Sequence, residues 1–534
     1  MNHVNNFMHP QVAIIDDSSV EDAFFIKGMR GKMRELGRPI IEVPRGKYED
    51  FLWLSQLDSG SLANWHKPNV DLLVHVPPGA SGGLIRLLQS LTAADYAGLH
   101  PPRLTIELPA DIDPFTKDFL QQYEWPPAIA TDGIVPRPQH ALTLHHRITP
   151  TRASTEASSI RFLESFFPTD PLDNHILVLS SQTEVSPLFY HYLTYQLLEH
   201  HWSNTGNAER DHLFGIALAA PQTYLNGSDG LILPTIEDVT SSKYKQPEDA
   251  DATSAPFLWQ APNADAALIF GDKWTELHDY VSNRLTAMRT TRGATKVEKL
   301  VSETQPSWME FMLELMRSRS WTMLYPAQST AGKWVTVHNE LYQVPEEFKE
   351  ISKKPSKDEE DAEPIEMEEP FLLSGQVVPS EAPNQQERPV VQHTQPLHAL
   401  LPFEGKLPDL PDLPILDFEG VATSLVSMQL ESTVYSKTLR QTIGGCDASE
   451  AKRSRKLHVG QTDDLFCFEG EARDYADDED DEANDTAEPD VVVGEISAKT
   501  SQDKVQIKGA RNALHDVVTG EGVATPKENT NIDS

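Results

Sequence analysis

The residues best placed for chemistry lie in a short polar turn, SSQTEVSP, between an apolar stretch that begins at His175 and an amphipathic one that ends near Trp202. The turn contains one carboxylate, Glu184, and several hydroxyl groups. In parallel α/β sheets such turns follow the carboxyl ends of strands, where ligands bind. The turn is therefore expected either to bind a metal ion or a phosphate group, or to have lost that chemistry.

A second candidate is the glycine-rich turn PPGASGG, Pro77–Gly83, which follows a buried strand and opens a helix. Backbone N–H groups at Gly79, Ser81 and Gly82 could receive a diphosphate, helped by the helix dipole. The spacing matches neither the dinucleotide-binding fingerprint nor the P-loop. A flexible connection between strand and helix is the alternative interpretation.

Four further residues could take part in chemistry. Glu107 ends the strand LTIEL, where its carboxylate could accept from a nucleobase N–H or a sugar hydroxyl; the alternative is a solvated strand end. Glu310 and Glu314 lie one helical turn apart, so either could be a general base, or both could form a solvated helix face. His338 follows the strand WVTV and is a candidate metal ligand, although a lone histidine is more often a satisfied polar residue.

The elements that must position these residues alternate between strands and helices. Apolar runs are followed by helix-like stretches three times between Asn69 and Pro168, and again from His175 to Trp202. This alternation indicates βαβ units, hence an α/β fold with a mostly parallel sheet and helices on both faces. The turns after Val76, Leu108 and Leu179 would share one edge of that sheet.

Composition divides the chain into three parts. Residues 1–60 are predicted to form a strand-helix-strand extension, residues 68–348 the main domain, and residues 349–534 a largely disordered acidic tail with a strap at 400–447. The tail has no tryptophan and contains long acidic runs. Both cysteines, Cys446 and Cys467, fall in this tail, so the folded body is expected to have no disulfide.

The net charge of -36 disfavours nucleic acid as a partner, because phosphate backbones need clustered Lys and Arg. No run approaches 18 apolar residues, so no transmembrane segment is expected. The first residues lack the basic-then-apolar plan of a signal peptide. As written, the sequence predicts a soluble, cytoplasmic protein, unless a missing 5′ exon changes its start.

Several stretches in this order, among them GGLIRLLQSLTAADY, LTIELP, HILVLSSQTEVSPLFYHYL and SWMEFMLELMRSRSWTMLYP, resemble a fungal and plant family of family-two-like glycosyltransferases. The resemblance covers roughly Pro68 to Tyr342. It implies a GT-A fold, a Rossmann-like sheet that binds nucleotide-diphospho-sugars, and places many relatives in the secretory pathway.

In such enzymes the turn after the strand typically contains aspartates that hold manganese or magnesium on the donor diphosphate. Leu179, Ser186, Pro187 and Phe189 match the flanks of that pattern. The three acidic positions are taken by neutral residues, and these are Ser180, Ser181 and Gln182. The resemblance therefore implies a diphosphate cradle with a weakened metal site, to which only Glu184 and His338 could contribute.

The segment SWMEFM resembles the one that carries the catalytic acid in related inverting enzymes, which makes Glu310 the candidate base. The same resemblance places Glu107 near the position used for base recognition. The predicted function is transfer of a sugar from a nucleotide-sugar donor to a glycan, protein or lipid acceptor, with inversion. The alternative is a catalytically inactive homologue that binds or scaffolds, and in either case the acidic tail could serve as an interaction segment.

Overall fold

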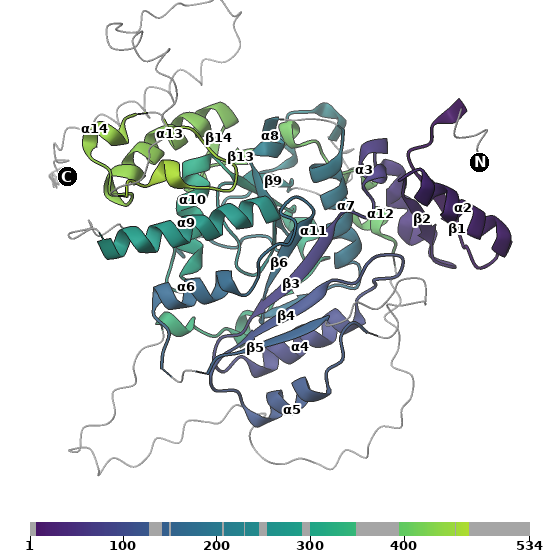
Figure 1. Cartoon of the computed structure of the whole chain (residues 1–534), viewed down its shortest axis with the longest axis horizontal. Coiled ribbons are helices and arrows are strands. Elements are labelled where there is room, and N and C mark those ends of the chain that lie inside the picture. The colour runs from purple at the N-terminus through teal and green to yellow at the C-terminus, as the bar shows by residue number, and fades with distance from the viewer. Residues whose placement is uncertain are drawn as a thin grey trace, which may run out of the picture. The chain divides into compact units, whose positions relative to one another are not determined.

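The computed structural model describes residues 7–127, 141–148, 151–204, 208–228, 230–244, 254–290, 299–348, 395–453 and 455–468 (Figure 1). Residues 1–475 form one compact unit, to which all of these belong. Within this part of the chain, no helix is long and apolar enough to cross a membrane.

A ten-stranded sheet is the centre of the molecule, with the strand order β14-β13-β9-β11-β8-β10-β6-β3-β4-β5. The strands from β6 to β5 pair in parallel, whereas β10 runs antiparallel to both of its neighbours. The strands of the sheet are β3 (Asn69–His75), β4 (Arg103–Leu108), β5 (Leu142–His146), β6 (Asn174–Ser180), β8 (Leu213–Ala217), β9 (Phe257–Trp259), β10 (Ala266–Ile269), β11 (Thr322–Tyr325), β13 (Ile415–Leu416) and β14 (Ala422–Thr423). A separate antiparallel pair joins β7 (Thr183–Val185) to β12 (Val335–Val337).

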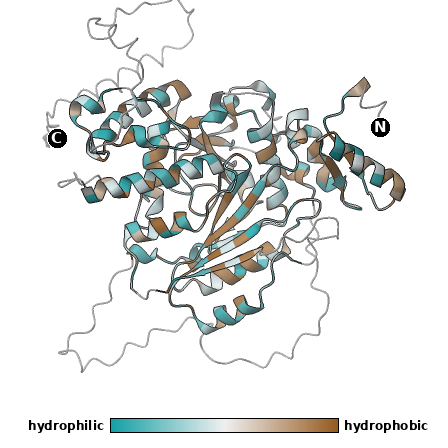
Figure 2. Cartoon of the chain, viewed as in Figure 1, coloured by the Kyte–Doolittle hydropathy of each residue, from teal (hydrophilic) through white to brown (hydrophobic). Residues whose placement is uncertain are grey.

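Helices cover both faces of the sheet, and the central strands are largely apolar, with polar residues mostly near their ends (Figure 2). Along β3, Leu72 and Val74 belong to one core and Leu73 to the other, as the two-residue period of a strand requires. The main helices are α4 (Ser81–Ala93), α5 (Pro114–Gln122), α6 (Thr155–Glu164), α7 (Phe189–Trp202), α9 (Gly271–Thr290) and α10 (Trp308–Arg319). The predicted α/β class with a mostly parallel sheet is confirmed.

The strand register gathers polar residues at one edge. His75, the last residue of β3, pairs with Glu107 on one side and with Ser180 on the other. Because β10 is antiparallel to β6, its first residue, Ala266, pairs with Leu179 at the same edge. Residues that are far apart in the sequence thus meet where three strands end and one begins.

The N-terminal segment adds a separate two-stranded sheet to the compact unit. Strand β1 (Ala13–Asp16) and strand β2 (Ile40–Val43) pair in parallel, with α2 (Ala23–Glu35) between them in the chain. Asp22 caps α2 by accepting from the N–H groups of Phe24 and Phe25. These three elements match the predicted strand, helix and strand. The 3-10 helix η1 (Glu49–Gln56) and α3 (Ser59–Ala63) connect them to β3, and α8 (Ala208–Asp211) and α11 (Gln328–Ala331) are short connecting helices.

The predicted boundary of the folded part at residue 348 is wrong. Residues 395–468 contain α12 (Leu397–Leu400), α13 (Leu425–Thr442) and α14 (Ala448–Ala451), and they add β13 and β14 to the sheet. The proline-punctuated stretch buries its leucines in the main core, among them Leu397, Leu410 and Leu413. The low-complexity composition therefore concealed leucines that pack against the main core. The rest of the predicted tail lies outside the described residues.

The same segment overturns the expectation that the folded body has no disulfide. Cys446 and Cys467 are bonded to each other, 21 residues apart, and Cys446 is buried. The bond joins the end of α13 to the stretch around the 3-10 helix η9 (Asp463–Leu465). Arg319 of α10 holds that stretch through paired hydrogen bonds to Asp464 of 2.7 and 2.8 Å. The disulfide thus belongs to the compact unit.

Candidate functional site

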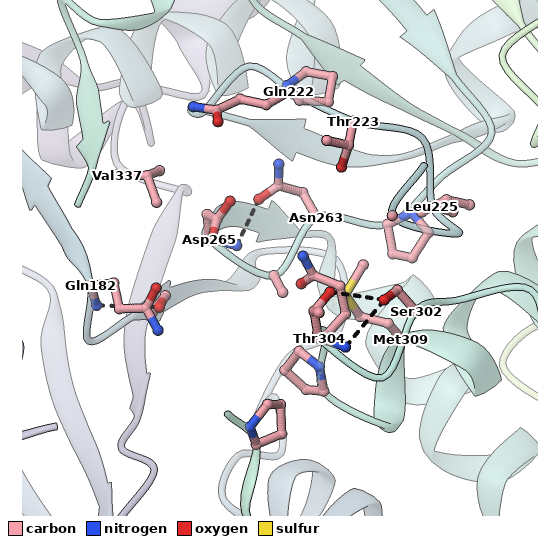
Figure 3. Close-up of a pocket in the computed structure, with 18 of the residues that line it drawn as sticks. Gln182, Gln222, Thr223, Leu225, Asn263, Asp265, Ser302, Thr304, Met309 and Val337 are labelled. Atoms are coloured by element: carbon pink, nitrogen blue, oxygen red, sulfur yellow. Dashed lines mark hydrogen bonds between the residues drawn. The ribbon is translucent and has the colours of Figure 1, made fainter. Parts of the chain in front are cut away.

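A cleft of about 300 Å³ opens at the edge where β3 and β6 end and β10 begins (Figure 3). Its described lining combines apolar residues with neutral polar ones and several aromatic rings, and none of these residues is Lys or Arg. The amides come from Gln182, Gln222, Asn263, Gln305, Asn339 and Gln343, and the rings from Tyr224, Trp259, Trp308, Tyr325 and Tyr342. Amide groups satisfy hydroxyl groups and rings pack against the faces of sugars or bases, so the lining suits a carbohydrate or a nucleoside.

Asp265 supplies the one carboxylate among the described residues that line the cleft. It immediately precedes β10, where its backbone N–H donates to the Asn263 side chain at 2.9 Å and its carbonyl accepts from Ser180 N–H at 2.7 Å. These bonds hold the backbone and leave the carboxylate facing the cleft (Figure 3). Burial raises the pKa of Asp265 to about 6, since few polar groups replace its water.

The polar turn places two of its three predicted residues on the cleft. Ser180 and Gln182 line it, and the Ser180 hydroxyl accepts from the Gln182 backbone N–H at 3.2 Å. Ser181 is fully buried instead and does not line the cleft. Its carbonyl lies 2.5 Å from where a Cβ on Gly83 would be, so only glycine lets α4 approach the turn this closely.

The glycine-rich turn borders the same edge. Gly79 has a φ of +89°, which favours glycine, and a Cβ there would lie 3.3 Å from Oε1 of Gln343 in the cleft wall. Gly82 faces open space, and the Ser81 hydroxyl is engaged by Asp113. Helix α4 begins at Ser81, and its N-cap residue, Ala80, has no capping side chain, so no side chain of the described residues caps the N–H groups of its first turn.

Glu107 is placed below the cleft, with its side chain 2% exposed. One oxygen accepts from Arg161 of α6, and the other contacts Nδ1 of His75 at 2.6 Å. Burial and the charge of Arg161 lower the pKa of His75 to about 4, so its ring is neutral and donates from Nδ1. His75 lines the cleft, whereas Glu107 touches it only through this histidine.

The predicted metal ligands Glu184 and His338 do meet, with Nε2 of His338 2.9 Å from the Glu184 carboxylate. The other ring nitrogen of His338 contacts Glu340 at 3.1 Å. Because the two ring nitrogens point in opposite directions, these carboxylates cannot converge with the histidine on one ion. No group of three or more His, Cys, Asp or Glu within the described ranges could hold a metal. These residues therefore do not fit a divalent cation.

Glu310 lies in a second cavity of about 410 Å³, which shares the wall Ser302, Gln305 and Pro306 with the cleft. Its carboxylate accepts from Val301 N–H at 2.8 Å and from Leu300 N–H at 3.1 Å. Burial raises the pKa of Glu310, against the effect of these bonds. Of the predicted residues, Ser180 and Gln182 line the cleft, whereas Gly79, Ser81 and Gly82 do not, and Glu310 lies on the other side of a shared wall.

Two residues of the cleft, Asp265 and His75, were not predicted from the sequence. Asp265 sits between alanines in PNADAALIF, and His75 ends an apolar run, so neither belongs to a recognisable pattern. The one available indication was position, because each adjoins a buried strand at the ligand edge.

Comparison with known proteins gives limited results. Residues 1–65 match the family model described as the SPBC1E8.03c N-terminal domain. No curated protein matches the sequence of this chain. The solved structures with detectable similarity include the crystal structure of GalNAc-T7 with UDP, GalNAc and Mn2+, at 10% identity and a TM-score of 0.27. The match covers 48% of this chain and 41% of that one, so this chain spans less than half of the neighbour.

Proposed function

We propose that this chain binds a nucleotide sugar in the cleft and transfers the sugar, with inversion, to an acceptor hydroxyl. The observation that carries the proposal is Asp265, the one carboxylate among the described residues of a cleft whose described lining has amides and aromatic rings but no Lys or Arg. This lining suits a sugar, and the carboxylate suits the removal of a proton from a hydroxyl. The acceptor class, whether glycan, protein or lipid, is left open.

The donor diphosphate is assigned to the turn Gly79–Gly83. The cleft lining described above offers no Lys or Arg, so the positive potential has to come from the backbone. The first turn of α4 supplies free N–H groups and the positive end of a 13-residue helix dipole. Ser180 and Gln182 are assigned to the sugar, because both line the cleft beside Asp265.

Asp265 is assigned as the general base, in preference to Glu310. A base must reach the hydroxyl, and the Glu310 carboxylate is occupied by two backbone N–H groups in the second cavity. A pKa of about 6 leaves Asp265 ionised at neutral pH while raising its basicity above that of an exposed aspartate. One carboxylate in the described lining favours direct displacement, since a double displacement also needs a nucleophile.

No step is assigned to a divalent metal, because Glu184 and His338 do not form a site for one. GalNAc-T7, the structural neighbour, is bound to Mn2+ in its crystal structure. The metal-independent donor site is therefore part of the proposal. A compartment that permits disulfides, such as the secretory pathway, is proposed from the Cys446–Cys467 bond.

A second candidate function is sugar binding without transfer. It is favoured by the lack of basic side chains in the described lining, which suits a neutral glycan better than a diphosphate. In that case Asp265 would accept hydrogen bonds from sugar hydroxyls and would not remove a proton.

Thermal unfolding with UDP-sugars, GDP-sugars and free oligosaccharides, each with and without Mn2+, tests both proposals. Stabilisation by a nucleotide sugar in the absence of metal supports the first. Stabilisation by oligosaccharides alone supports the second. If no nucleotide sugar raises the unfolding temperature, the transferase proposal fails.

A further inference from the structure

The residues around His75 form a chain of contacts that starts in α6 and ends in the cleft. Arg161 donates to Glu107, and Glu107 accepts from Nδ1 of His75, with all three side chains largely or fully buried. The register places His75 directly between Glu107 and Ser180, so these side chains lie on the same face of the sheet. This chain of contacts is not used in the proposed transfer.

This chain of contacts determines which ring nitrogen of His75 carries the proton. Arg161 keeps Glu107 ionised, and an ionised carboxylate can only accept a hydrogen bond. The proton of the neutral ring must therefore be on Nδ1, which leaves Nε2 with a lone pair. The other charged groups that act on this pair are Glu346 and Glu347, which neighbour it from the 3-10 helix η6 (Glu346–Phe348).

Glu346 and Glu347 are engaged elsewhere. Glu346 pairs with Arg147, and Glu347 accepts from the N–H and the hydroxyl of Ser307 at 2.9 and 2.7 Å. Neither contacts the imidazole directly, so they do not compete with Glu107 for its proton. Nε2 is then the ring nitrogen of His75 that is left for the cleft.

We infer that His75 is a specificity-determining residue, which accepts a hydrogen bond from a donor group on the ligand through Nε2. The inference rests on the proposed function for the identity of the ligand. Within the UDP part of such a ligand, this donor is either the imide N–H of the base or a hydroxyl of the ribose. A ligand with an acceptor or a methyl group at this point would leave Nε2 unpaired, at a cost of about tenfold in affinity.

The tautomer is measured in the full-length wild type by long-range ¹H–¹⁵N correlation with ¹⁵N-labelled histidine. The His75 signals are assigned by their loss in His75→Phe. A proton on Nδ1 and an unprotonated Nε2 are expected. A proton on Nε2 would overturn the inference, because that nitrogen could no longer accept.

Affinity is measured by titration calorimetry with UDP, N3-methyl-UDP and dUDP, without metal. Wild type should prefer UDP over one analogue by about tenfold, and His75→Phe should lose that preference. If the preference that His75→Phe loses is the one for UDP over N3-methyl-UDP, the group that donates to Nε2 is the imide N–H. If it is the preference for UDP over dUDP, the donor is the ribose hydroxyl. The matched control is His146→Phe, an exposed histidine on β5 that does not line the cleft, which should keep the preference.

An unchanged preference in His75→Phe would overturn the inference, provided that its unfolding temperature shows it to be folded. Should His75→Phe fail to fold, His75→Leu, which also has no hydrogen-bond acceptor, replaces it, and an unprotonated Nε2 in wild type remains the required result. Failure of wild type to bind any nucleotide or nucleotide sugar would reject the proposed function. That failure would not change the tautomer of His75. The tautomer decides separately whether Nε2 can accept a hydrogen bond.

Discussion

The cleft and the second cavity share a wall at Ser302, Gln305 and Pro306, yet they use carboxylates in opposite ways. In the second cavity, Glu314 accepts from Tyr280 and Arg284, and Glu310 accepts from two backbone N–H groups. In the cleft, Asp265 has its backbone fixed and its carboxylate left open. Buried acids with complete sets of partners build structure, whereas a buried acid without them is available to a ligand.

The largest expected effect comes from Asp265→Asn. An amide cannot take a proton from the acceptor, so the rate of sugar transfer should fall by roughly 10³-fold. Donor affinity, measured by calorimetry, should change by less than about threefold, since the volume is the same. If Asp265→Asn transfers sugar at an undiminished rate, Asp265 is not the general base. The cleft would then have no reactive acid to distinguish it from the second cavity.

The next largest expected effect is a loss of stability in Glu314→Gln. Glu314→Gln should lower the free energy of unfolding by about 3 kcal/mol, because it leaves Arg284 charged and poorly paired at a site where the two side chains are 11% and 5% exposed. Chemical denaturation measures this change. The control is Glu303→Gln, which breaks the exposed pair with Lys299 and should cost less than about 0.5 kcal/mol. If both variants lose the same free energy of unfolding, the buried pair of Glu314 contributes no more to stability than the exposed pair of Glu303.

A smaller loss of about 2 kcal/mol is expected for Glu310→Gln, because one amide oxygen replaces two charged acceptors of the Leu300 and Val301 N–H groups. The shared wall should stay in place, so transfer should retain more than about a third of its rate. If Glu310→Gln instead binds the donor normally and transfers no sugar, the general base is Glu310. The second cavity, and not the cleft, would then hold the reactive acid.

The smallest effect is the pH dependence of stability. The pKa of Asp265 is raised to about 6 in the folded protein, so the fold prefers the protonated acid and loses stability as pH rises from about 4 through 6. Asp265→Asn should match wild type at pH 4 and be the more stable of the two at pH 8, because the amide carries no charge that burial disfavours. Thermal unfolding across this range measures the difference. A variant that is less stable than wild type at pH 8 would mean that the carboxylate has a favourable partner.

Strand endings were the most predictable part of the site. Ser180, Gln182 and Glu107 were placed at the ligand edge because a buried strand followed by a polar turn determines that position. What Glu107 contacts was not predictable, since Arg161 reaches it from a helix 54 residues later. For Glu310, helical spacing indicated a face of α10 but not which of two cavities that face meets.

The C-terminal segment was missed for a different physical reason. Proline and acidic residues dominate its composition and are typical of disorder. Its leucines nevertheless bury themselves one at a time against the existing core, as Leu397 and Leu410 do, so no helical or strand period appears. A segment that packs onto an already folded surface needs a few apolar side chains to bury there. It does not need apolar residues at the regular spacing of a helix or a strand.

Strand β13 has a consequence for how the chain folds as it is synthesised. It pairs in parallel with β9 through Ile415 and Leu416, and it also carries β14. Until the ribosome has released residue 416, the outer edge of β9 presents unpaired N–H and C=O groups between buried strands. The nascent protein therefore passes through a stage in which this edge of its sheet is open to pairing with other chains.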